Sequence, residues 1–147
     1  MKVRRPPQQT LAFIGPGADM PEPIAFVSDV HIEPGNRERV ERFGEFLSAV
    51  AGKAARLYIL GDLFDYWVGR GHERQADYSA VLKHIRAATD SGLSIAVLHG
   101  NRDYLLNSSF TAITGAAIAG SALRLDIDGH CVHLCHGDAF CEWDRGH

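Results

Sequence analysis

The chain has 147 residues, of which 46% are hydrophobic and 22% are charged, a composition typical of one globular domain. It excludes an intrinsically disordered chain, and no apolar run reaches the roughly 18–20 residues of a membrane-spanning helix. The 15 Lys and Arg residues against 18 Asp and Glu residues leave a net charge of −3, which gives no indication of a nucleic acid partner.

Short apolar runs alternate with amphipathic stretches along the chain. They predict a strand at 24–27, a helix at about 37–51 capped by Asn36, a strand at 57–60, a helix at 75–89, a strand at 93–98 and a short helix at 108–114. Alternating patterns at 123–127 and 131–135 predict a β-hairpin that turns at Asp128-Gly129. The order βαβαβα predicts a parallel sheet covered by helices, followed by this hairpin.

Residues 1–23 contain five of the six prolines, and we expect them to form a flexible Pro-rich extension. Met20 lies just before the first strand and is an alternative start. We expect residues 24–147 to form one domain. Cys131 and Cys135 would lie about 13 Å apart along a strand, beyond the reach of a disulfide. We therefore expect reduced thiols and a cytoplasmic protein.

Polar clusters follow four predicted strands: Asp29-Val30-His31, Gly61-Asp62 with Asp65, Gly100-Asn101-Arg102-Asp103, and His136-Gly137-Asp138. Ligands bind at the carboxyl ends of the strands in open α/β sheets, so we expect these clusters to converge. Carboxylate, amide and imidazole groups suit Mn²⁺, Mg²⁺, Fe or Zn²⁺.

Three of these residues suggest how ions would be held. Asp29 and His31 are two residues apart, so in an extended segment both would point to one side and could hold one ion. Asp62 could bridge two ions, which would clamp a phosphoryl group and lower the pKa of a water between them.

Arg102 could bind phosphate oxygens as a fork. Asp65 and Asp103 are expected to support a ligand or to cap the following segment.

The patterns D-x-H, GD-x-x-D, GN-R-D and a later H-G resemble those of the calcineurin-like metallophosphoesterases. Longer strings are similar to one branch, the UDP-2,3-diacylglucosamine pyrophosphohydrolases of lipid A synthesis: YILGDLFDYWVG at 58–69, LHGNRDYLLNSSF at 98–110 and HGDAFCEWD at 136–144. The resemblance covers residues 24–147 and implies an α/β fold, the α+β sandwich of this family. It also implies an enzyme that cleaves the diphosphate of UDP-2,3-diacylglucosamine to lipid X and UMP, by attack of a metal-bridging hydroxide.

The resemblance assigns a role to each matched residue. It implies two Mn²⁺ ions, the first held by Asp29 and His31 and the second by Asn101 and His136, with Asp62 bridging both. Arg102 would contact the diphosphate, and Asp144 would help to bind the sugar. The partner implied is a UDP-diacylglucosamine-like lipid, with the enzyme peripheral to the cytoplasmic face of the inner membrane.

The chain departs from the family pattern in its last part. The later G-H-x-H, with one histidine for each metal, has no counterpart here, nor does the helical insertion that covers acyl chains. His147 stands where the family often has an aromatic contact. We therefore expect a fragment, the N-terminal two thirds of such an enzyme, that binds metal weakly and turns over slowly. Two alternatives stay open: a non-catalytic metal- or nucleotide-binding remnant, and another metallophosphoesterase such as a nucleotide pyrophosphatase or phosphodiesterase.

Apolar residues flank the polar loops, and two interpretations of them stay open. They either pack beneath the loops or form an apolar wall for an acyl chain or a base. The residues concerned are Phe64, Tyr66, Trp67, Tyr104, Leu105 and Leu106. The sequence gives no indication of oligomeric state.

Overall fold

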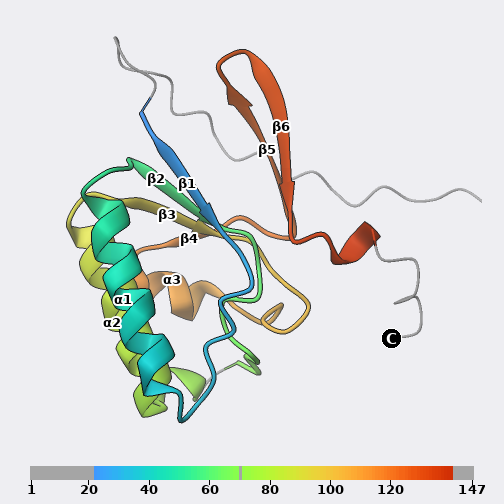
Figure 1. Cartoon of the computed structure of the whole chain (residues 1–147). Coiled ribbons are helices and arrows are strands. Elements are labelled where there is room, and N and C mark those ends of the chain that lie inside the picture. The colour runs from blue at the N-terminus through green and yellow to red at the C-terminus, as the bar shows by residue number, and fades with distance from the viewer. Residues whose placement is uncertain (1–21, 70, 141–147) are drawn as a thin grey trace, which may run out of the picture.

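The computed structural model describes residues 22–69 and 71–140, and its centre is a four-stranded parallel sheet (Figure 1). The strand order is β1-β2-β3-β4, with β1 at Ile24–Val27, β2 at Arg56–Ile59, β3 at Ser94–Val97 and β4 at Ala117–Ile118. The predicted α/β class is confirmed, and so are the first three strands, each end to within one residue. Strand β4 was missed because two residues are too short to show a period.

Two helices lie side by side on one face of this sheet (Figure 1). Helix α1 spans Arg37–Ala51 and helix α2 spans Ala76–Asp90. The predicted cap is present, because the Asn36 side chain accepts from the Arg39 N–H at 3.1 Å. The two helices approach closely at Gly44, where an added Cβ would lie 2.7–2.9 Å from the His84 ring. His84 is therefore a half-buried residue that packs against α1.

A β-hairpin packs against the opposite face of the sheet. Strands β5 (Ala122–Ile127) and β6 (His130–Cys135) pair antiparallel, and both turn residues, Asp128 and Gly129, have positive φ of 52° and 78°. This left-handed pair is the turn that Asp-Gly predicts. Apolar side chains of the hairpin join sheet residues in a second small core: Tyr58, Leu98, Ala119, Leu123 and Leu134.

The main core lies between the sheet and the two helices. It includes strand residues such as Leu57, Ile59 and Val97 and helix residues such as Val81 and Ile85, each with no exposed surface. Burial of strands between layers explains their continuous apolar runs. Helix α3 (Ser108–Thr114) and two single-turn 3₁₀ helices, η1 (His72–Arg74) and η2 (Asp138–Phe140), complete the elements described.

Several predictions concern residues outside the described part. The Pro-rich extension 1–23, apart from its last two residues, lies outside it, as do Asp144 and His147. Cys131 and Cys135 are free thiols, as expected. Within residues 22–69 and 71–140, no helix has the length and apolar character needed to cross a bilayer.

Candidate metal centre

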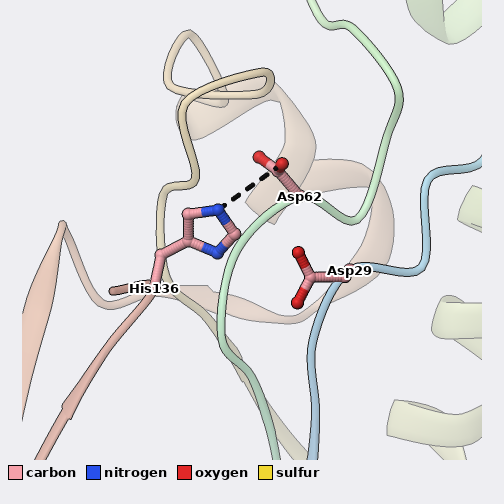
Figure 2. Close-up of side chains that lie close together, drawn as sticks. All are labelled: Asp29, Asp62 and His136. Carbon is pink, nitrogen blue, oxygen red and sulfur yellow. Dashed lines mark ion pairs between the residues drawn. The ribbon is translucent and has the colours of Figure 1, made fainter. Parts of the chain in front are cut away.

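The carboxyl ends of β1, β2, β3 and β6 lead to one site. Asp29 follows β1, Asp62 follows β2 and His136 follows β6, and one ligand atom of each lies within 4.8 Å of those of the other two. Figure 2 shows the three side chains pointing toward a common centre from three separate segments. Two carboxylates and an imidazole at this spacing form a donor set suited to a divalent cation. The convergence expected from the strand ends is therefore what the structure shows.

The loops after β1 and β2 run together beyond the sheet. His31 N–H donates to Asp62 O at 3.0 Å, and Ile32 N–H donates to Leu63 O at 2.9 Å. A further bridge pairs Ile32 with Phe64. These backbone contacts hold the side chains of the two loops in a fixed relation.

The expectation that the segment of Asp29 and His31 is extended is wrong. Asp29, His31 and Asp62 have positive φ of 54°, 48° and 52°, the left-handed region that non-glycine residues rarely adopt. The two side chains nevertheless meet, with His31 Nε2 3.7 Å from Asp29 Oδ1. Two left-handed turns, and not strand alternation, bring them together. Such backbone strain at three neighbouring polar residues is typical of functional sites.

Two glycines permit close approach of the segments at the centre. A Cβ on Gly61 would lie 2.7 Å from His136 Nδ1 and 2.8 Å from Gly100 Cα. A Cβ on Gly100 would overlap the backbone N and the carboxylate of Asp62. Any side chain at either position would therefore displace a proposed ligand.

The protein orients the His136 ring through its backbone. His136 Nδ1 lies 2.9 Å from the carbonyl oxygen of Leu60, to which the ring N–H donates. Its other nitrogen, Nε2, then faces the Asp62 carboxylate, 3.5 Å from Oδ2. This arrangement leaves an Nε2 lone pair free for a cation, as in many metal-binding histidines. The partner Leu60 carries no polar side chain, so no sequence pattern could have indicated this contact.

Asp103 is buried completely and organises the loop that carries Asp62. Its Oδ1 accepts from the N–H groups of Gly100 at 2.9 Å and Asp62 at 3.2 Å. Its Oδ2 accepts from Leu63 at 2.7 Å and Phe64 at 3.3 Å. Burial raises the pKa of Asp103 above its ordinary value, the N–H groups of Gly100, Phe64 and Leu63 oppose that rise, and the charge of Asp62 adds to it. The sequence left a supporting or capping role open, and the structure shows Asp103 accepting the backbone N–H groups of Asp62 and of the two residues after it.

Asn101 and Arg102 both contact Asp62. The Arg102 N–H donates to Asp62 Oδ1 at 3.0 Å. The Asn101 amide lies against the same carboxylate, and its nitrogen, when turned inward, donates to Oδ1 at 3.2 Å and Oδ2 at 3.0 Å. When the Asn101 amide is turned the other way, its oxygen faces the Asp62 carboxylate oxygens. A cation bound between these oxygens would favour that orientation. Asn101 is thus placed beside the centre but outside the triad of Asp29, Asp62 and His136.

The residues present fit a divalent cation. Asp29, Asp62 and His136 offer two carboxylates and one imidazole, and His31 Nε2 lies 3.8 Å from Asp62 Oδ2. Oxygen and imidazole ligands of this kind hold Mn²⁺, Mg²⁺, Fe or Zn²⁺. Five predicted ligands therefore lie at one edge of the sheet, and their individual roles in binding an ion stay predictions. Arg102 lies at the border of this site with a half-exposed guanidinium.

The flanking apolar residues divide into two groups. Phe64 and Trp67 are buried with ring centroids 4.8 Å apart, and Leu106 is buried as well, so these three pack beneath the loops. Tyr66, Tyr104 and Leu105 are instead 41%, 60% and 41% exposed. Tyr78 of α2 supports the buried group and donates to Tyr66 O at 3.0 Å. Burial raises the Tyr78 pKa to about 12.

The comparison with protein families decides the classification of this chain. The model of the calcineurin-like phosphoesterase family matches residues 22–139. The chain belongs to this family.

Curated relatives within the calcineurin-like phosphoesterases share one name. The chain is 37% identical over 126 residues to the UDP-2,3-diacylglucosamine hydrolase of Neisseria gonorrhoeae, which covers 85% of this chain and 52% of the relative. It is 36% identical over 116 residues to the protein of that name from Pasteurella multocida, covering 79% and 48%. The chain thus spans about half the length of the curated relatives it matches.

A solved structure shows the same fold. The nuclease MPE of Pseudomonas putida superposes with a TM-score of 0.51 at 21% identity, over 69% of this chain and 50% of that one. At this identity the likeness concerns the fold alone. The family and the sandwich-type α/β architecture predicted from the motifs are both confirmed.

Proposed function

We propose that this chain carries the metal-binding part of a phosphoric-anhydride hydrolase that acts on UDP-2,3-diacylglucosamine. The observation that carries the proposal is the meeting of Asp29, Asp62 and His136 at the ends of separate strands, within 4.8 Å. The name shared by the curated relatives supports this substrate. Cleavage of its diphosphate would give lipid X and UMP.

The proposed cofactor is Mn²⁺, held by Asp29, His31, Asp62, Asn101 and His136. A divalent ion bound there would polarise a phosphoryl oxygen and lower the pKa of a bound water. The protein's own contribution is positional. Asp103 fixes the loop of Asp62, and the Leu60 carbonyl turns the Nε2 of His136 toward the centre. Arg102 is placed to bind oxygens of the diphosphate.

The substrate proposed is part lipid, and exposed apolar side chains follow two of the site's loops in the sequence. Tyr66 and Val68 follow Asp65, Tyr104 and Leu105 follow Asp103, and these four side chains are 41–67% exposed. Exposed apolar side chains beside a polar centre suit a ligand with both kinds of surface. We place the reaction in the cytoplasm at the face of the inner membrane, where a diacylated sugar nucleotide would be presented. Sedimentation with anionic lipid vesicles tests that location.

The test of the function is turnover by the 147-residue chain in the presence of Mn²⁺. UMP released from UDP-2,3-diacylglucosamine is measured by chromatography, beside a dinucleoside polyphosphate and a phosphodiester. We expect the diacylglucosamine substrate to be preferred and Asp62→Ala to abolish its turnover. The matched control is Asp90→Asn, which changes an acidic residue on the exposed side of α2.

Two results would contradict the proposal. Faster turnover of the other substrates would favour a different metallophosphoesterase. Mn²⁺ binding without turnover of any substrate would favour a non-catalytic metal-binding module.

A further inference from the structure

His31 uses only one of its ring nitrogens toward the proposed metal centre. Its Nε2 lies 3.7 Å from Asp29 Oδ1 and 3.8 Å from Asp62 Oδ2. Its Nδ1 is buried and has no hydrogen-bond partner among residues 22–69 and 71–140. A metal-binding imidazole that uses Nε2 carries its proton on Nδ1, and that N–H needs an acceptor.

Asp65 places a carboxylate oxygen beside that nitrogen. Asp65 Oδ1 lies 3.8 Å from His31 Nδ1, and the same oxygen accepts from Arg102 Nη1 at 3.0 Å. The backbone holds Asp65 in this position, because its N–H donates to Ile32 O at 2.9 Å. The backbone of Arg102 is held as well, because the Trp67 N–H donates to the Arg102 carbonyl oxygen at 3.1 Å.

We propose that Asp65 is a positioning residue that orients both His31 and Arg102 through one carboxylate oxygen. It would accept the Nδ1–H of His31 when Nε2 binds a cation, with a small closure of the 3.8 Å gap. It would also hold the Arg102 guanidinium at the border of the centre, where a phosphate oxygen would lie. The inference rests on the proposed function, because it assigns Asp65 a place in the same site.

Stability alone does not account for this arrangement. The side chains of Asp65 and Arg102 are 35% and 51% exposed, and ion pairs of that exposure contribute little to folding. Arg86 and Asp90 form a comparable exposed pair at 2.9 Å on α2, far along the chain from the centre. What distinguishes the Asp65 pair is the buried His31 nitrogen at its other side.

The test compares Asp65→Asn with the matched variant Asp90→Asn, which removes the same charge from an exposed arginine pair. The Mn²⁺ dissociation constant of each 147-residue chain is measured by electron paramagnetic resonance of free Mn²⁺. The side-chain ¹⁵N–¹H signals of His31 are recorded with Mg²⁺ bound. We expect Asp65→Asn to weaken Mn²⁺ binding by about 10–100-fold and to shift the His31 Nδ1–H signal. Asp90→Asn should stay within two-fold of the wild type with an unchanged signal.

Two outcomes would overturn the proposal. One is an Mn²⁺ affinity of Asp65→Asn within two-fold of the wild type. The other is a weaker affinity with the His31 Nδ1–H signal unchanged, since that would reflect only the lost charge.

A third measurement separates this inference from the proposed function. If the wild-type chain binds no Mn²⁺, the proposed function fails for this chain, and the role of Asp65 is decided on the metal-free protein. There, Asp65→Asn must speed hydrogen exchange of the Arg102 guanidinium. Exchange at the wild-type rate would overturn the role of Asp65.

Discussion

Replacing Asp103 by asparagine tests how the loop of Asp62 is held. The buried carboxylate accepts four backbone N–H groups, two on each oxygen. Asparagine has nearly the same shape but offers one acceptor oxygen, and its amide nitrogen would face two N–H donors. Two hydrogen bonds are lost in either amide orientation, and two buried N–H groups lose their partner.

The expected magnitude follows from these contacts. Two hydrogen bonds to a charged acceptor contribute about 3–6 kcal/mol together. Burial makes the charge of Asp103 costly and so raises its pKa, and the neutral amide avoids that cost. We therefore expect Asp103→Asn to lower the free energy of unfolding by about 2–4 kcal/mol at pH 7.

Urea unfolding followed by circular dichroism measures the change. With a slope of about 2 kcal/mol per molar urea, the midpoint should fall by about 1–2 M. The control Asp90→Asn removes one exposed ion pair and should change stability by less than about 0.5 kcal/mol. A loss below about 0.5 kcal/mol for Asp103→Asn as well would refute the view that this carboxylate organises the loop.

Three further predictions concern single side chains. His136→Ala should weaken Mn²⁺ binding at least ten-fold in calorimetry, whereas His133→Ala, which changes an exposed hairpin residue, should leave it unchanged. Gly100→Ala should lower the free energy of unfolding by about 1–3 kcal/mol in urea, because the added Cβ meets the Asp62 backbone. The control is Gly52→Ala, where the nearest neighbour of an added Cβ lies at 3.9 Å. Equal losses in the two variants would contradict the steric argument. The pKa of Tyr78 is raised to about 12 from 10.0, so the unfolded chain loses this proton first and stability falls between those pH values. Tyr78→Phe should lack that component of the fall, and identical alkaline curves for the two proteins would refute it.

Much of the fold could be read from local patterns. The apolar runs at β1, β2 and β3 and the helical spacing in α1 and α2 reflect burial on one or both faces, which repeats along the chain. Asn36 and Asp128-Gly129 mark a helix start and a hairpin turn because their side-chain and backbone preferences act within a few residues. The site was located by one topological rule, that parallel strands present their carboxyl ends at one edge.

Tertiary structure decided how the site is built. The left-handed backbone of Asp29 and His31, the carbonyl of Leu60 behind His136 and the four N–H groups around Asp103 were not predicted. Nor was the single oxygen that Asp65 presents to both His31 and Arg102. These contacts join residues up to 76 positions apart, and several use backbone atoms that every residue possesses. Residue type therefore determined which groups could bind a metal, and the packing of separate segments determined which of them meet and how each is oriented.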